Sequence, residues 1–227
     1  MIRMDNVSRN YRNGDIVVRA LREVSLAVEK GEFISIAGPS GSGKTTLLNL
    51  VGCIDRPDSG EIFIDGEPVS ARTKKELALL RREKLGFVFQ TFNLIPVLTA
   101  LENVSFVLSL LGIREKEIRE RSRAVLAEVG LSGKEDVLPG RLSGGQQQRV
   151  AVARALVKAP GIVLADEPTA NLDSKTGEEI LKLMEKLNRD HDTTFVFSTH
   201  DPMVMDYAHR LVSLHDGTIV SDERRAA

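Results

Sequence analysis

Short apolar runs separated by turn residues dominate the first third of the chain. Residues 24–28 and 33–37 have the length and apolar content of strands, and the second run ends in a glycine-rich loop. Apolar and polar residues alternate over 60–69 around Asp65-Gly66, a typical signal of a two-residue hairpin. The pattern therefore predicts a β-rich beginning. It also predicts a helix over 45–51 and a strand over 85–90.

The middle of the chain has a helical pattern instead. From residue 100 to about 129 the apolar spacing is that of a charge-rich amphipathic helix, with REKEIRERSRAVLAEV at its centre. No strand pattern returns until Gly161. We therefore expect a helical insertion of about 70 residues, approximately 91–160, within a larger fold.

The last third alternates strands and helices. Residues 161–165 form a near-continuous apolar run, which is typical of a strand buried on both faces. The other predicted elements are helix 174–188, strand 194–198, helix 202–208 and strand 211–214. Strands that alternate with helices favour an α/β fold with a mostly parallel core sheet. Because the sequence shows no repeat and no linker, we expect residues 1–227 to form a single domain.

Composition narrows the possible functions. The chain has 227 residues, 28% of them charged, with a net charge of −1, so no global positive field draws it to nucleic acid. With one cysteine, Cys53, no internal disulfide can form, and we expect Cys53 to be a small core residue in the helix after the phosphate loop. The longest uncharged apolar run, 104–113, is far shorter than the roughly 20 residues of a membrane span. With a polar N-terminus, this predicts neither membrane insertion nor secretion.

Residues 38–45 read GPSGSGKT and match the phosphate-loop pattern G-x-x-x-x-G-K-[ST]. An apolar strand precedes the loop and a helix follows, so backbone N–H groups and the helix N-terminus can cradle phosphate oxygens. Lys44 would bridge the β- and γ-phosphates, and the Thr45 hydroxyl would bind Mg²⁺. The loop alone does not distinguish ATP from GTP. The predicted nucleotide-binding residues here are Gly38, Pro39, Ser40, Gly41, Ser42, Gly43, Lys44, Thr45 and Thr46.

Two acidic residues, Asp166 and Glu167, follow the predicted buried strand 161–165. In phosphate-loop proteins a carboxylate at such a strand end holds Mg²⁺, which is the role predicted for Asp166. Glu167, one residue further on, is placed to accept a proton from an attacking water. A strand that simply ends in acidic turn residues is the alternative. That alternative is less favoured because a phosphate loop follows another strand of the same predicted sheet.

A second glycine motif, LSGGQ, occupies residues 142–146. Ser143 is a good N-cap for the following helix, and Gly144 and Gly145 leave backbone N–H groups open toward an anion. One nucleotide rarely needs two such sites on one chain. The motif therefore points to a nucleotide held by another copy. The predicted contacts are Leu142, Ser143, Gly144, Gly145 and Gln146.

Together, the phosphate loop, LSGGQ and LADE resemble the ATP-binding cassette (ABC) ATPases over essentially the whole chain. The resemblance implies a core that binds ATP and Mg²⁺, an antiparallel β subdomain and a helical subdomain. It also implies ATP hydrolysis, a head-to-tail homodimer around two ATPs, and a separate integral membrane permease. The protein would lie at the cytoplasmic face of the inner membrane.

Four further residues take roles from this resemblance. Tyr11 resembles the aromatic residue that stacks on adenine, and Gln90 resembles the glutamine that senses Mg²⁺ and the attacking water. Asp173 resembles the loop residue that crosses to the opposite protomer, although Ala170 and Asn171 depart from the commoner Ser or Gly. His200 resembles the switch histidine at the γ-phosphate, in keeping with ligand binding at strand carboxyl ends.

Longer segments indicate which branch of the ABC family the sequence resembles. GCIDRPDSGEI and LGFVFQTFNLIPVLTALENV look like the lipoprotein-release and macrolide-export branch, and a cassette that regulates a cell-division permease is a close relative. Transport and regulation both stay open. Repair-type ABC proteins have a long coiled coil where this chain has about 100 residues, translation types have two cassettes, and a kinase or GTPase would lack LSGGQ.

Overall fold

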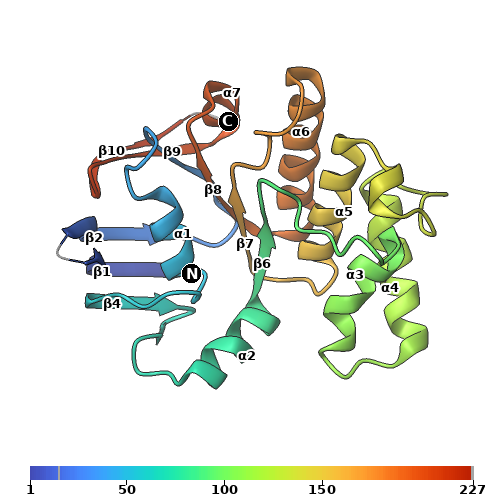
Figure 1. The fold of residues 1–227 in the computed structure, drawn as a ribbon, viewed down its shortest axis with the longest axis horizontal. Helices are drawn as coiled ribbons and strands as arrows, with labels where there is room; N and C mark the ends of the chain where they lie inside the picture. Colours follow the sequence, from blue (N-terminus) through green and yellow to red (C-terminus); the bar gives the residue numbers. More distant parts are fainter. Residues whose placement is uncertain (15, 226–227) are drawn as a thin grey trace. The chain divides into compact units, whose positions relative to one another are not determined.

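The computed structural model describes residues 1–14 and 16–225. These residues group into two compact units (Figure 1). The first consists of residues 1–81 and the C-terminal segment from Thr194, and the second consists of residues 82–193. Among the described residues, no helix is both long enough and apolar enough to cross a bilayer.

The first unit contains an antiparallel sheet of strand order β2-β1-β4-β5. Its strands are β1 (Ile2–Asn13), β2 (Ile16–Val28), β4 (Ser59–Ile64) and β5 (Glu67–Pro68). The turn from β4 to β5 has φ of 52° at Asp65 and 81° at Gly66. Positive φ at both central residues is what a two-residue hairpin turn of this hand requires, so the predicted hairpin is confirmed.

The same unit holds four strands in the order β10-β9-β3-β8. They are β3 (Phe33–Ala37), β8 (Thr194–Thr199), β9 (Arg210–His215) and β10 (Thr218–Arg224). β3 runs parallel to both β8 and β9, and β10 is antiparallel to β9. Every residue of β3 and β8 is buried. Helices α1 (Lys44–Val51) and α7 (Pro202–Tyr207) follow β3 and β8.

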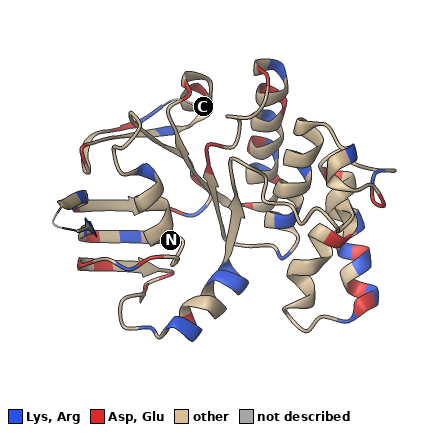
Figure 2. Ribbon diagram, in the orientation of Figure 1, with Lys and Arg blue, Asp and Glu red and all other residues tan. Residues whose placement is uncertain are grey.

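The second unit combines a parallel strand pair with four long helices. The pair is β6 (Leu85–Val88) and β7 (Ile162–Asp166). The helices are α3 (Ala100–Ser109), α4 (Glu115–Glu128), α5 (Gly144–Leu156) and α6 (Ser174–His191), with a short 3₁₀ turn over Pro139–Arg141. The predicted helical segment, 91–160, lies within this unit. Charged residues make up much of α4 (Figure 2), and only Ser122 and Leu126 of that helix are buried.

Several predicted boundaries are corrected. The helix expected over 100–129 is two helices, because the chain turns through Gly112 at a φ of 70°. The strand expected over 85–90 ends at Val88, and the strand expected over 194–198 extends to Thr199. Cys53 is buried as predicted, but it lies beyond the end of α1 rather than inside it. Strands β1 and β10 and helix α2 (Lys74–Lys84) were not among the predicted elements.

Candidate functional site

The phosphate loop connects β3 to α1 in the first unit. Gly43 takes a φ of 107°, and a Cβ there would collide with the backbone oxygen of Ala20 on β2. Only glycine lets the loop pass this close to the strand. The Ser42 hydroxyl oxygen is buried and has no hydrogen-bond partner among the described residues. A buried, unsatisfied hydroxyl inside a glycine-rich loop fits a phosphate ligand.

Lys44 is folded back over this loop. Its ammonium donates to the carbonyl oxygens of Gly38 at 2.7 Å and Pro39 at 2.9 Å, and the residue is buried. Gly43 precedes the helix as its N-cap, and no side chain caps the first turn of α1. The positive end of the helix and the lysine therefore serve the same loop, as an anion site requires.

His200 belongs to the same edge of the sheet as the phosphate loop. The register pairs Ala37 of β3 with Thr199 of β8, so Gly38 and His200 each follow the end of neighbouring parallel strands. Such strands lie about 4.8 Å apart. His200, which is exposed, therefore lies beside the start of the loop.

Tyr11 lies on β1 of the first unit, opposite Val18 of β2. Both side chains are partly exposed, and the Tyr11 hydroxyl donates to the carboxylate of Asp55 at 2.9 Å. An aromatic ring next to an exposed apolar residue is a surface on which a flat, apolar-faced ligand can stack.

Gln90 and Asp166 lie together in the second unit. Val88 of β6 pairs with Ala165 of β7, so Asp166 and the segment ending in Gln90 leave the parallel pair at the same edge. The Asn171 side chain donates to the backbone oxygen of Gln90 at 2.8 Å. Glu167 has a φ of 46°, a strained conformation that directs the chain sharply away from the strand.

The LSGGQ motif begins α5. Ser143 forms a capping box, because its side chain accepts from the Gln146 backbone N–H and the Gln146 side chain accepts from the Ser143 N–H. The predicted N-cap is therefore confirmed. The second glycine of the motif, Gly145, faces Thr176 so closely that a Cβ would collide with the threonine methyl.

Asp173 contacts the same threonine, Thr176. As N-cap of α6 it accepts hydrogen bonds from the Thr176 N–H at 3.0 Å and from its hydroxyl at 2.6 Å. These bonds to the Thr176 hydroxyl and backbone hold the pKa of the Asp173 carboxyl below its ordinary value. Thr176 thus joins the glycine motif to the loop of Asp173.

Arg154 holds the segment after Gln90, a contact that the sequence analysis did not identify. Its guanidinium donates to the backbone oxygens of Phe92, at 2.7 Å, and of Asn93. Both acceptor residues have positive φ, 58° and 49°. Burial lowers the pKa of Arg154. The contact of Asn171 with the Gln90 backbone was likewise not predicted, although the sequence placed Asn171 in the loop of Asp173.

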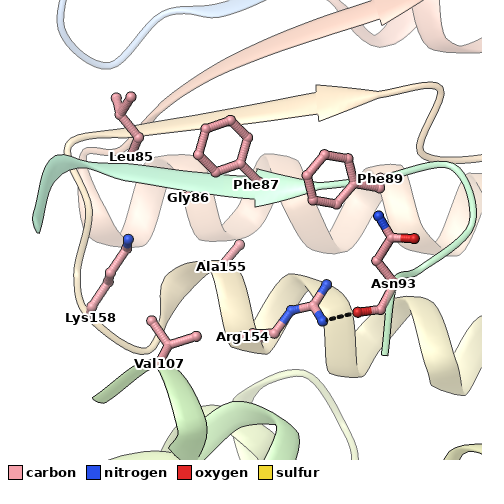
Figure 3. A pocket seen from close by; sticks show the side chains of 9 residues that line it. All are labelled: Leu85, Gly86, Phe87, Phe89, Asn93, Val107, Arg154, Ala155 and Lys158. Atoms are coloured by element: carbon pink, nitrogen blue, oxygen red, sulfur yellow. Dashed lines mark hydrogen bonds between the residues drawn. The ribbon is translucent and has the colours of Figure 1, made fainter. Parts of the chain in front are cut away.

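A cavity of about 220 Å³ opens beside Arg154 (Figure 3). Figure 3 shows Phe87 and Phe89 of the β6 segment on one side and the cationic side chains of Arg154 and Lys158 on the other. The pocket is thus apolar with a basic border. Its remaining lining residues are Leu85, Gly86, Asn93, Val107 and Ala155.

The predicted site residues form two sets, one in each unit. Among the described residues, no group of three or more His, Cys, Asp or Glu could hold a metal ion by itself. The predicted Mg²⁺ ligands are instead the hydroxyl of Thr45, the amide of Gln90 and the carboxylate of Asp166. All three supply oxygen, and Mg²⁺ usually takes one or two carboxylates together with phosphates and waters. The donor set therefore fits Mg²⁺.

Comparison with known proteins identifies the fold. The family model described as ABC transporter matches residues 21–170. A protein of Methanocaldococcus jannaschii, named uncharacterized ABC transporter ATP-binding protein MJ0796, is 46% identical over 228 residues, covering 99% of this chain and 97% of that protein. A solved structure described as the dimeric post-hydrolysis state of MJ0796 bound to ADP and Pi superimposes with a TM-score of 0.92 over both full chains.

A longer relative also matches. The macrolide export ATP-binding/permease protein MacB of Syntrophobacter fumaroxidans is 48% identical over 221 residues. These residues cover 96% of this chain but 31% of that protein, so the chain spans about a third of its length. With the cassette fold and the phosphate-loop and LSGGQ motifs in place, this chain belongs to the ABC transporter family, as one of its ATP-hydrolysing cassettes.

Proposed function

We propose that this chain is the energy-supplying subunit of an ABC transporter, which dimerises around two ATP molecules and drives a separate membrane permease. One observation carries the proposal: two glycine motifs begin two different helices, α1 and α5, in two different units of one chain. Each helix start suits an anion, and a head-to-tail pair of chains would use both motifs on each nucleotide.

Within this proposal each site residue has a role. Residues 38–46 bind the phosphates, Tyr11 stacks on the adenine, and residues 142–146 contact the ATP of the partner copy. Glu167 is the general base, and His200 contacts the γ-phosphate. Asp173 lies in the loop that crosses to the partner.

Thr45, Gln90 and Asp166 would hold Mg²⁺, which neutralises charge on the β- and γ-phosphates when bound. Their chemistry supports this role, since all are oxygen donors.

The energetics suit a switch. A hydrogen bond to a charged group contributes roughly 1.5–3 kcal/mol, and several per site over two sites reach on the order of 10 kcal/mol. Association costs an estimated 4–15 kcal/mol. Contacts to the γ-phosphate can therefore decide between open and closed dimers, and hydrolysis would release the pair.

The base is tested by Glu167→Gln, which keeps the shape of the side chain and removes the carboxylate. We expect ATP to trap a stable dimer with little turnover, measured by size exclusion and phosphate release. Hydrolysis at nearly the wild-type rate would show that another group activates the water.

The shared pocket is tested by mixing chains that carry Lys44→Ala with chains that carry Ser143→Arg. Each variant alone should be inactive, and the mixture should recover part of the turnover, because a mixed pair contains one intact site. If mixed pairs form without recovering turnover, the two motifs do not act on one nucleotide.

The permease would dock beside Gln90. The segment TFNLIPVLTALENV is apolar for a loop that follows a strand, Val97 is 79% exposed, and the cavity beside Arg154 borders the segment at Asn93. We expect Phe92→Ala and Leu98→Ala to weaken permease copurification, and Val220→Ala, an exposed apolar residue on β10, to leave it unchanged. Unchanged copurification of folded Phe92 and Leu98 variants would disprove the docking site.

We expect the permease to export a lipoprotein, a peptide or a macrolide-type compound. The branch-specific segments and the name of the MacB relative support this expectation. The cassette would work at the cytoplasmic face of the membrane, where ATP is available. A regulatory role on a cell-division-type permease is the second candidate, favoured by the same segments. Substrate flux in vesicles that contain the copurified permease distinguishes the two functions.

A further inference from the structure

Two residues outside the predicted nucleotide-binding set hold the side chain of Tyr11. The tyrosine hydroxyl donates to Asp55 Oδ2 at 2.9 Å, and the guanidinium carbon of Arg9 lies 4.9 Å from the ring centroid. One contact holds the hydroxyl end and the other covers a face of the ring. A guanidinium at this distance from a ring is within the range of a cation–π contact.

Arg9 and Asp55 also hold each other. Arg9 Nε and Nη2 donate to the two carboxylate oxygens of Asp55, both at 2.9 Å, and Nη1 donates to Asp58 at 2.7 Å. A bidentate pair fixes the plane of the guanidinium as well as its position. The side chains of Arg9 and Asp55 are about one-quarter exposed, so solvent screens the pair only in part. The ring of Tyr11 therefore lies in a preformed frame.

The same two elements position this frame and the phosphate loop. The Asp55 N–H donates to the backbone oxygen of Asn49 on α1, the helix that begins in the loop. On the other side, Tyr11 pairs with Val18 of β2. Two residues along β2, about 7 Å at the usual strand rise, Ala20 lies against Gly43 of the loop.

We propose that Arg9 and Asp55 are positioning residues that fix the ring of Tyr11 for purine stacking before the nucleotide arrives. The inference rests on the proposed function, in which Tyr11 stacks on adenine. Because Arg9 covers one face of the ring, the base stacks on the opposite face, and Val18, the cross-strand neighbour of Tyr11, is 55% exposed. Fixing the ring in the folded protein removes an ordering cost from binding, so the frame strengthens affinity without contact to the base.

The experiment measures the dissociation constants of ATP and of inorganic tripolyphosphate, which has phosphates but no base. Asp55→Ala and Tyr11→Phe each break the hydroxyl bond, and we expect each to weaken ATP binding about two- to tenfold. Tripolyphosphate binding should stay within twofold of wild type in both variants, and kcat should stay within twofold in Asp55→Ala. Arg3→Ala, which removes another cation–π contact on β1, over Phe63, is the matched control and should change neither ligand.

A double variant tests whether Asp55 acts through the hydroxyl of Tyr11. If Asp55 acts through the hydroxyl, Asp55→Ala with Tyr11→Phe weakens ATP binding no more than the stronger single variant. A spectroscopic readout is available because the chain has no tryptophan and two tyrosines. In a Tyr207→Phe background, the near-ultraviolet circular dichroism of Tyr11 should collapse in Asp55→Ala and persist in Arg3→Ala.

Three results overturn the proposal: additive effects in the double variant, equal loss of tripolyphosphate binding, or unchanged ATP affinity in Asp55→Ala. Tyr11→Ala separates this failure from that of the proposed stacking. If Tyr11→Ala weakens ATP binding and Asp55→Ala does not, the positioning role alone is wrong. If Tyr11→Ala binds ATP like the wild type, the stacking role is wrong as well.

Discussion

Lys158, at the edge of the cavity in the second unit, makes the stability of this protein depend on alkaline pH. Its ammonium donates to the backbone oxygen of Arg82 at 2.8 Å, and burial lowers the pKa of Lys158 to about 8 from its ordinary value of 10.5. Between these two values the unfolded chain binds a proton that the folded chain has released. The free energy of unfolding must therefore rise as pH rises from about 8 to 10.5.

The size of the rise follows from the difference of about 2.5 between the two values (10.5 − 8). At about 1.36 kcal/mol for each tenfold change in proton affinity, the upper limit is about 3.4 kcal/mol. Lys158 is only half-buried, so solvent screening reduces the expected rise to about 1–2 kcal/mol. Below pH 8 both states carry the charge, and the penalty for burying it is fully present.

The assay compares urea unfolding of the wild type and Lys158→Met at half-unit steps from pH 7 to 10.5. The variant cannot titrate at this position, so its lost hydrogen bond adds a constant offset while the difference between the proteins changes with pH. Lys186→Met, at a lysine on α6 whose side chain is 60% exposed, is the control and should give a flat difference. A flat difference for Lys158→Met as well would refute the reasoning.

Three further predictions concern single sites. Gly43→Ala should destabilise the fold by more than Gly41→Ala, because both alanines adopt an unfavourable positive φ costing about 1–3 kcal/mol, while only Gly43 also meets backbone; equal urea midpoints would contradict this. Burial raises the pKa of the Cys53 thiol from 9.0 to about 11. At pH 8 native Cys53 should therefore react with a disulfide reagent about 100-fold more slowly than the unfolded chain. Comparable rates would contradict this environment for the thiol. Ser143→Ala removes the cap of α5 and should cost about 1 kcal/mol in urea unfolding, whereas no loss would mean that the capping box contributes nothing.

Sequence reasoning found the parts of the site that short motifs encode. The phosphate loop, LSGGQ and the acidic strand end each have fixed spacing and a flanking element, so residues 38–46, 142–146 and Asp166 could be placed on loops, helix starts and a strand end from their sequence context alone. Elements with an irregular pattern were harder to detect. In β1 the buried residues are Ile2, Met4 and Val7, and register shifts after Met4 break the strict alternation that marks a strand in sequence.

Contacts between distant residues were beyond prediction. Arg154 binds carbonyls more than sixty residues away, and Tyr11 binds an aspartate 44 residues away. Backbone carbonyls leave no trace in sequence, and a lone carboxylate in a loop is too common to signal a partner. The break at Gly112 was missed because apolar residues, Leu111 and Ile113, flank the glycine directly, so no polar turn residue marks the end of the first helix.

The grip of Arg154 on the carbonyls of Phe92 and Asn93 has a mechanical consequence. Arg154 and Ser143 belong to one continuous helix, α5, eleven residues apart (154 − 143), or about 16 Å along its axis. We therefore expect a displacement of the loop after Gln90 to move α5 and, with it, the LSGGQ motif at the other end of the helix. Arg154→Lys should weaken this connection, because lysine cannot bind both carbonyls with a planar guanidinium. The loop after Gln90 and the LSGGQ motif would keep their own residues.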